Sequence, residues 1–344
     1  MPVMFSSTWI DGKINNIDGF LSRNRDRNFF FVLDTNFVIY AREYVQNKDT
    51  FAEDYPDICC DFIETLETII KLNGILVYQF ACEEASRSKK TGKISKKKYK
   101  LMVYCISKLF GYRFNDSIRS KNPPINENIT ETKVPLLKCN GLFSNHSAIT
   151  YAAILKAYTM KNFNKTQDDK EKILSYLEFL DQELNIYSPV FVSFSIHYFG
   201  KELNILKNAK PKIGFVEVLN KIYAASIDLM MPTEVAQLAE YDSENAAPIF
   251  VTFDKGAKLI FDSLSIVKYV NLPKHGSVPA YTFRIFTTSG WNKQDIEKFN
   301  VKSTELLNKR QINGSSSDLD YNRIFNLCAK LEKDLLTKMT RISL

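Results

Sequence analysis

Short apolar runs alternate with helical patterns along the chain. Phe29–Leu33 and Pro248–Phe253 are continuous apolar runs of strand length, and Ile75–Tyr78 is a third that follows Gly74. Runs of this kind, without polar alternation, are typical of strands buried on both faces, as in a parallel sheet. A further short run at 266–270 ends before Pro273. The pattern therefore predicts four strands in these places.

Helical spacing of apolar residues fills most of the remaining chain. It predicts helices at 58–71, from Glu83 through the lysine-rich segment to Phe110, and at 146–161, 168–186, 215–231, 233–241, 293–309 and 318–339. Thr166 is a candidate cap for the helix at 168–186, and Pro232 should stop or bend the preceding helix. Residues 189–199 are ambiguous, because their apolar residues alternate as in a strand while the flanking residues favour a helix.

The order strand, helix, strand, helix, long helical interlude, helix, strand, strand predicts an α/β fold. We expect an open, mostly parallel sheet between helices, with a helical insertion and a helical C-terminal tail. The predicted α/β domain covers residues 1–275, with its core at about 28–92 and 212–275 and the insertion at about 93–211. Residues 276–344 form the predicted helical extension.

Composition narrows the functional classes. The chain has 344 residues, of which 45% are hydrophobic and 25% charged, as in folded globular proteins. No stretch approaches ~18 uninterrupted apolar residues, and the N-terminus does not resemble a secretory signal. We therefore expect a cytoplasmic protein without a membrane partner, whose six cysteines are thiols.

The net charge of +7 is compatible with nucleic-acid binding. Seven lysines fall among the twelve positions 89–100, which a solvated helix face would also explain.

Carboxylates follow the two longest apolar runs. Asp34 comes directly after FFFVL and Asp254 directly after IFVTF. If the strands are neighbours and parallel, both carboxylates lie at the carboxyl edge of the sheet, where open α/β sheets bind ligands. Carboxylates crowded together without cations would force one to take up a proton, and a divalent cation removes that conflict. Each Asp alone could equally be a helix cap or a turn residue.

Two further acidic candidates lie on predicted helices. Asp228 stands in the apolar stretch AASIDLMM, where it either faces the core and needs a partner or lies on the exposed face. Glu83 and Glu84 open a helix, which the helix dipole alone could explain.

Together these segments resemble the PIN-domain nucleases. The similarity rests on Leu33-Asp34-Thr35-Asn36 as an opening motif, on the strand and helix at 75–89, and on Val251–Gly256 as a closing motif ending in Thr-Phe-Asp. It covers about residues 28–90 and 215–271. The insertion between the second and third motifs is longer than in compact members of the family, and the segment between Asp228 and Asp254 is longer too.

The resemblance implies a set of site residues. Asp34, Glu84, Asp228 and Asp254 would be the catalytic metal ligands, with Glu83 as the alternative to Glu84 and Asp242 or Glu244 as alternatives to Asp228. Asn36 and Thr252 would orient the carboxylates. An all-oxygen site suits Mg²⁺ or Mn²⁺.

The implied activity is hydrolysis of phosphodiester bonds in single-stranded or unpaired RNA, with single-stranded DNA as the alternative substrate. Arg87, Lys89, Lys90 and Lys93 follow Glu84 closely and are expected to hold phosphates. Tyr99 and Tyr104 would either stack bases or, as we expect, pack in the core.

Two other functions compete with this one. A catalytically silent PIN-like scaffold would bind RNA, or a protein partner through the insertion or the C-terminal helices. A phosphatase of the haloacid-dehalogenase kind also begins with an apolar strand ending in Asp, but it needs a second Asp where this chain has Asn36.

Overall fold

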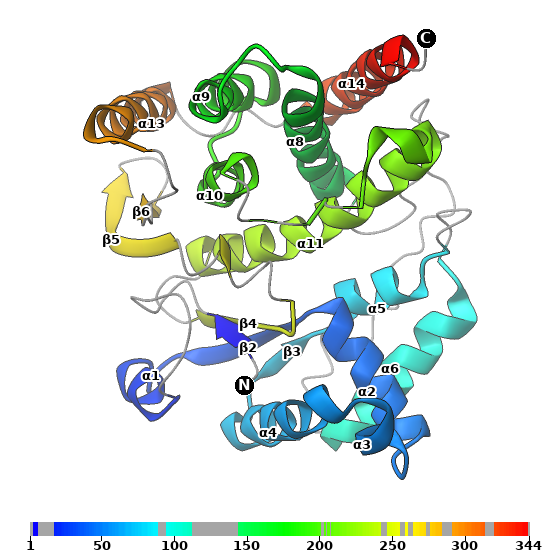
Figure 1. The fold of residues 1–344 in the computed structure, drawn as a ribbon. Coiled ribbons are helices and arrows are strands. Elements are labelled where there is room, and N and C mark those ends of the chain that lie inside the picture. The colour runs from blue at the N-terminus through cyan, green and yellow to red at the C-terminus, as the bar shows by residue number, and fades with distance from the viewer. Residues whose placement is uncertain are drawn as a thin grey trace. The chain divides into compact units, whose positions relative to one another are not determined.

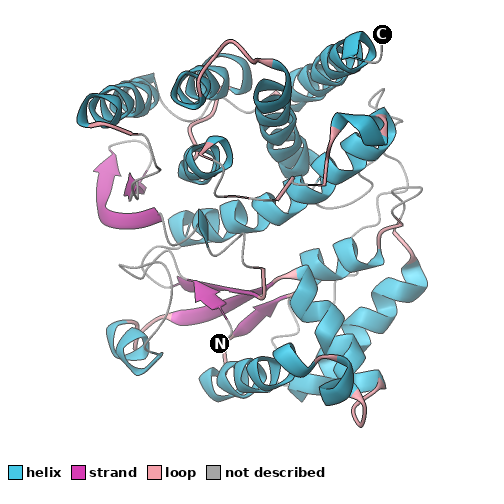
Figure 2. Cartoon of the chain, in the orientation of Figure 1, coloured by secondary structure: helices cyan, strands magenta, loops and turns pink. Residues whose placement is uncertain are grey.

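The protein was analysed as a computed structural model. The structure describes residues 3–5, 17–88, 94–111, 144–200, 203, 205–206, 208–241, 246–254, 259–260, 264–272, 276–283, 291–313 and 320–342. Helices dominate these residues, with one small sheet and one separate pair of strands (Figure 2).

The chain divides into two compact units. The first contains residues 1–130, 138–143 and 234–258, and the second contains residues 131–137, 144–233 and 259–344. The chain therefore leaves the first unit after its N-terminal segment and returns to it for the strand before Asp254. Most of the predicted insertion and all of the predicted C-terminal extension belong to the second unit.

A four-stranded sheet forms the centre of the first unit (Figure 1). Its strands, in spatial order, are β1 (Val3–Phe5), β4 (Ala246–Thr252), β2 (Asn28–Leu33) and β3 (Ile75–Val77). The three strands β4, β2 and β3 are parallel, and β1 runs antiparallel to β4 at the edge. The prediction of a mostly parallel sheet is therefore confirmed for these strands.

Continuous apolar sequence makes β2 and β4 the central strands. Phe31, Leu33, Ile249 and Val251 point to one face and belong to a single buried cluster. Val32 on the alternate face of β2 is fully buried as well. A strand buried on both faces has no polar positions to alternate with, which explains the unbroken runs in the sequence.

Five helices of the first unit follow the strands in the chain. They are α2 (Thr35–Gln46), α3 (Phe51–Asp54), α4 (Pro56–Leu72), α5 (Gln79–Ser86) and α6 (Lys96–Phe110); the short helix α1 (Ile17–Arg23) precedes β2. Helices α2, α5 and α6 contact one another. The chain turns from α4 to β3 at Asn73, which adopts a left-handed conformation, and Gly74. A side chain at Gly74 would collide with the backbone of Phe29, so this close approach requires glycine.

The second unit is a helical assembly with one hairpin. Its elements are α8 (Ser144–Phe163), α9 (Asp169–Phe179), the π-helix η2 (Leu180–Leu184), α10 (Pro189–Phe199), the 3₁₀ turn η3 (Pro211–Ile213), most of α11 (Phe215–Tyr241), β5 (Leu264–Leu272), β6 (Gly276–Phe283), α13 (Lys293–Asn313) and α14 (Tyr321–Ile342). Every residue of α10 from Val190 to Phe199 is buried. Helix α14 packs on α8, where the Tyr151 hydroxyl donates a hydrogen bond of 2.8 Å to the buried Glu332.

Several sequence predictions need correction. The ambiguous segment 189–199 is a helix. Its polar residues are buried together with its apolar ones, so their alternation does not mark a strand with one exposed face. The helix at 168–186 is capped by Asp168 rather than Thr166, in a capping box with Glu171. Pro232 does not end a helix, because α11 continues through it.

The remaining differences concern the strands and the lysine-rich segment. The predicted strand at 266–270 lies in β5, which pairs with β6 in a separate hairpin and not with the parallel sheet. The patterns in the sequence did not predict β1 or β6. The single helix expected from Glu83 to Phe110 is two helices, α5 and α6.

No helix among the described residues is long and apolar enough to cross a membrane.

Candidate acidic site

Three parallel strands end at the same edge of the sheet in the first unit. Leu33 of β2 is level with Val251 of β4, and Val32 is level with Val77 of β3. The Asp34 amide continues the ladder by donating to the Val251 carbonyl over 3.0 Å. Residues that follow these strands in the sequence are therefore brought together in space, as the carboxyl-end argument predicted.

Asp34 is the centre of this edge. It is the N-cap of α2, and its Oδ1 accepts a hydrogen bond of 2.8 Å from the Thr35 amide. Its Oδ2 accepts a hydrogen bond of 2.6 Å from the hydroxyl of Thr252, the last residue of β4. Asp34 is therefore both a helix cap and a buried carboxylate that links β2 to β4.

Glu84 joins the site from α5. Its Oε2 accepts a hydrogen bond from the Thr35 hydroxyl, so Thr35 contacts Asp34 through its amide and Glu84 through its side chain. Glu84 is partly buried, one and a half turns into the helix that follows β3. Between the two candidates in the second motif, this contact favours Glu84. Glu83 is buried in the same helix.

Both carboxylates hold their protons more tightly than free side chains do. Burial raises the pKa of Asp34 to about 6, an effect that the hydrogen bonds from Thr252 and Thr35 partly oppose and the charge of Asp254 increases. Burial also raises the pKa of Glu84 to about 7, where the Thr35 hydroxyl and Arg87 act against it and the charge of Asp34 adds to it. The two acids thus destabilise each other when both are ionised.

Asp254 follows β4 at the same edge. Its amide donates a hydrogen bond of 2.9 Å to the Thr252 hydroxyl, and the same hydroxyl donates to Asp34. Thr252 therefore ties the backbone at Asp254 to the Asp34 carboxylate. Asn36 also hydrogen-bonds Asp34 and lowers its pKa.

The remaining predicted residues are Asp228, Arg87 and five residues that the structure does not describe. Asp228 is partly exposed on the section of α11 that belongs to the second unit. Five further predicted residues lie outside the described part of the chain: the phosphate-binding candidates Lys89, Lys90 and Lys93, and the substitutes Asp242 and Glu244. Arg87 is described, and its charge lowers the pKa of Glu84.

The carboxylate oxygens of this site are possible ligands for a divalent metal ion. Within the described ranges, no three His, Cys, Asp or Glu side chains form a group that could hold a metal ion. The two linked carboxylates, Asp34 and Glu84, nevertheless fit Mg²⁺, which is commonly bound by one or two carboxylates and keeps several waters. Three hydrogen bonds, from Thr35, Asn36 and Thr252, occupy three of the four lone pairs of the Asp34 carboxylate and leave one for a cation.

Thr35 is a site residue that the sequence reasoning missed. It was treated as the small residue of the opening motif, although a hydroxyl next to a strand-terminal Asp at a helix N-terminus could have signalled a second contact. Its role depends on where α5 lies against α2, which the spacing of residues along the chain does not give.

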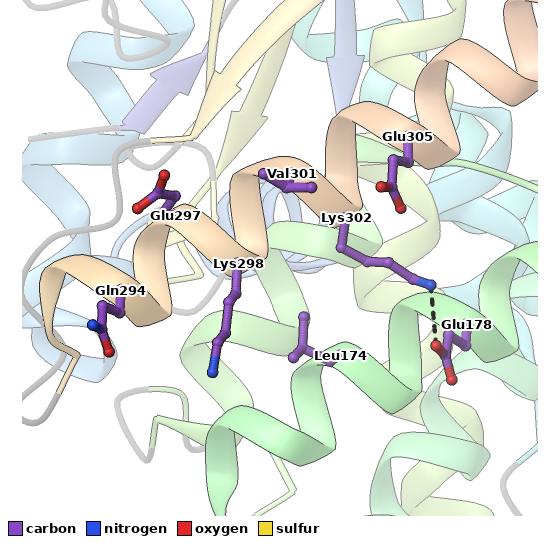
Figure 3. Close-up of a pocket in the computed structure, with 8 residues that line it drawn as sticks. All are labelled: Leu174, Glu178, Gln294, Glu297, Lys298, Val301, Lys302 and Glu305. Carbon is purple, nitrogen blue, oxygen red and sulfur yellow. Dashed lines mark ion pairs between the residues drawn. The ribbon is translucent and has the colours of Figure 1, made fainter.

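The second unit contains a shallow pocket between α9 and α13 (Figure 3). It is lined by Leu174, Glu178, Gln294, Glu297, Lys298, Val301, Lys302 and Glu305. Both acidic and basic side chains line it, and Lys302 pairs with Glu178 across it at 3.1 Å. Its charges are largely balanced, as expected of two solvated helix faces, and none of the candidate acidic residues lines it.

Comparison with protein-family models, with curated proteins and with solved structures found no match to this chain.

Proposed function

We propose that the chain is a metal-dependent nuclease with a PIN-like site, which hydrolyses phosphodiester bonds in single-stranded or unpaired RNA. One observation carries the proposal. Parallel pairing of β2 with β3 and β4 places Asp34, Glu84 and the backbone at Asp254 around two threonine hydroxyls. The same order of elements carries the resemblance in the sequence.

Asp34 and Glu84 are the residues that would hold Mg²⁺ or Mn²⁺, and Asp254 is the third candidate. When bound, such an ion would polarise a phosphate oxygen and lower the pKa of a coordinated water. The raised pKa values of the two carboxylates support this assignment, because burial makes their charges costly and a nearby cation would offset that cost. Asp228 remains a proposed ligand.

The protein's own groups prepare the site in three ways. The hydroxyl of Thr252 orients Asp34, and the hydroxyl of Thr35 orients Glu84, which fixes both carboxylates relative to the sheet edge. Burial keeps water away from the carboxylates and strengthens their interaction with a cation. Arg87 adds a positive charge beside Glu84, where a phosphate of the substrate would lie.

The test uses the full-length protein and end-labelled single-stranded RNA, with single-stranded and duplex DNA alongside. We expect cleavage with Mg²⁺ or Mn²⁺ and none with a chelator. Asp34→Asn and Glu84→Gln should each lower the rate by at least ~100-fold, as removal of a metal ligand or its support does. Asp168→Asn, which changes a carboxylate at an exposed helix cap of the second unit, is the matched control and should cut normally.

Cleavage that persists in Asp34→Asn and Glu84→Gln would place the activity elsewhere. Cleavage that requires no divalent ion would remove the metal from the mechanism.

A second function, a catalytically silent scaffold, is favoured by one observation. The described residues do not supply three clustered metal ligands, although two carboxylates are linked. A scaffold would bind RNA or a protein without cutting, and calorimetric titration of Mn²⁺ would separate the two functions. No heat of binding at the acidic site, together with no cleavage, would favour the scaffold.

A further inference from the structure

Helix α6 carries a positive stripe that contains no acidic residue. Its sequence, KKKYKLMVYCISKLF, has five lysines and neither Asp nor Glu. Lys97, Lys100, Tyr104 and Lys108 are all exposed. At 3.6 residues per turn these four positions fall within about 80° of one another, along about 16 Å of helix. We call these four residues the α6 stripe.

The opposite face of α6 is fixed in the core. Tyr99, Met102, Ile106 and Phe110 are buried with residues of α2, α4 and the sheet. Tyr99 is therefore a core residue, as expected, whereas Tyr104 is 58% exposed and does not pack in the core. The helix presents its stripe outward because its apolar face is already occupied.

The cations of this helix oppose its own stability. Three lysines, Lys96, Lys97 and Lys98, occupy the first turn, where the positive end of the helix dipole disfavours them. Lys97 and Lys100 stand three residues apart, a spacing at which like charges repel. A face that only needed solubility would gain from acidic partners four residues away, and α6 has none.

The start of α6 lies next to the end of α5, within the same unit. The Ser95 amide donates a hydrogen bond of 3.0 Å to the Ser86 carbonyl at the end of α5, and Arg87 forms a β-bridge with Ile94. The start of α6 is thus fastened to the helix that carries Glu84. Figure 1 shows α6 beside α5 and α2, which agrees with their contacts.

We propose that the α6 stripe binds a single strand of nucleic acid, with Lys97, Lys100 and Lys108 on successive phosphates and Tyr104 stacked on a base. Lysines attract the phosphate backbone of any nucleic acid, but an exposed aromatic ring between them selects strands whose bases are unpaired. The inference deepens the proposed nuclease function, on which it rests for the identity of the strand as substrate. An anionic membrane fits less well, because a membrane-surface helix inserts its apolar face and that of α6 is buried.

Binding is measured without cleavage, so that the inference and the nuclease can fail separately. The full-length Asp34→Asn protein in chelator is titrated into a labelled oligouridine of about 12 nucleotides, the equivalent DNA, a duplex and anionic vesicles, over a range of salt. We expect single strands to bind more tightly than the duplex, with an affinity that falls steeply with salt.

The stripe variant is Lys97→Gln with Lys100→Gln and Lys108→Gln. Because each phosphate contact on a single strand contributes about 0.7 to the salt slope, the slope should fall by about 2. The matched control changes three exposed lysines of the second unit, Lys210→Gln, Lys212→Gln and Lys333→Gln. It alters the net charge equally and should keep the slope of the parent.

Tyr104 separates stacking from charge. Tyr104→Ala should weaken single-strand binding by about 5- to 160-fold, while Tyr104→Phe keeps the ring and should bind like the parent. Circular dichroism checks that every variant folds, and replacing the three stripe lysines by Arg should restore binding if the fold is intact.

An equal loss in the control triple, an unchanged slope in the stripe triple, or no binding by the parent would overturn the inference. So would a preference for vesicles or duplex over single strands. If the stripe variants lose binding while the wild-type protein cuts nothing, the stripe stands and the nuclease function fails.

Discussion

Replacing Asp34 with Asn should stabilise the metal-free protein at neutral pH, although the substitution disturbs a hydrogen-bonded site. Burial raises the pKa of Asp34 from 3.8 to about 6, so the folded state holds this proton more tightly than the unfolded state does. Ionising Asp34 therefore lowers the free energy of unfolding as the pH rises from about 4 to about 6 and above. The difference between the two pKa values corresponds to about 3 kcal/mol.

The amide of Asn cannot reproduce both contacts. The two carboxylate oxygens accept from the Thr35 amide and the Thr252 hydroxyl, and an amide has one oxygen to offer. The lost hydrogen bond costs about 1 kcal/mol at every pH. Asp34→Asn should thus be about 1 kcal/mol less stable than wild type near pH 4 and about 2 kcal/mol more stable near pH 7.5.

The assay is urea unfolding followed by far-ultraviolet circular dichroism, in chelator, from about pH 4 to about pH 8. Hydrogen exchange of peptides from β2 and α2 reports the same change within the first unit. Asp168→Asn removes a carboxylate from an exposed helix cap and controls for the loss of one charge. Adding Mg²⁺ or Mn²⁺ should stabilise the wild type and not Asp34→Asn.

A difference between wild type and Asp34→Asn that does not change with pH would refute the reasoning. It would mean that Asp34 ionises as easily in the folded state as in the unfolded chain. The positions of Asp34 and Glu84 would then no longer support the binding of a cation.

Three other substitutions test the contacts around the site and the packing of both units. Thr252→Val removes the hydroxyl that orients the buried Asp34 carboxylate, so the free energy of unfolding in urea near neutral pH should fall by about 1–3 kcal/mol. Thr252→Ser keeps the hydroxyl and should retain the wild-type value. Gly74→Ala would place Cβ 2.6 Å from the carbonyl oxygen of Phe29, and thermal unfolding should show a loss of about 1–3 kcal/mol. Tyr151→Phe removes the hydroxyl that donates a hydrogen bond to Glu332, whose pKa is already raised by burial. Ionised Glu332 should therefore cost the variant more stability than it costs the wild type. The loss of hydrogen-exchange protection in α8 and α14 should grow as the pH rises through the ordinary range of Glu.

The sheet could be predicted from the sequence because its signal is local. An apolar run between polar ends defines each of β2, β3 and β4, and the Asp after β2 and the Asp after β4 mark the edge where they end. The pairing of β2 with β4, more than 200 residues apart, was only a condition of the argument about the two aspartates, and the structure meets it.

Other elements could not be predicted, because tertiary context decides them. Helix α10 is buried on every side, and periodicity cannot distinguish such a segment from a buried strand. The run in β5 looks like one more strand of the main sheet, and only its pairing with β6 shows that it is not. Pro232 interrupts a pattern of apolar spacing without ending α11, a case in which the surrounding structure overrides local preference.

The candidate site was predictable in its aspartates but not in its contacts. Asp34 and Asp254 followed from the ends of the strands, and Thr252 was expected to orient a carboxylate. The link from Thr35 to Glu84 depends on the packing of α5 against α2, which no spacing along the chain encodes.

Two features of the first unit oppose its own stability. Asp34 and Glu84 are kept close together, where burial raises both pKa values and the charge of Asp34 raises that of Glu84 further. Helix α6 keeps lysines at the wrong end of its dipole and contains no acidic residue of its own. Such departures from local preference occur where function requires them. A cation bound between the two acids would offset their negative charge, and a polyanion bound along the lysines would offset their positive charge. A phosphodiester strand with its metal ion would supply both. Under the proposed function, the acidic edge would hold the scissile phosphate with its metal ion and the α6 stripe would hold the flanking part of the same strand.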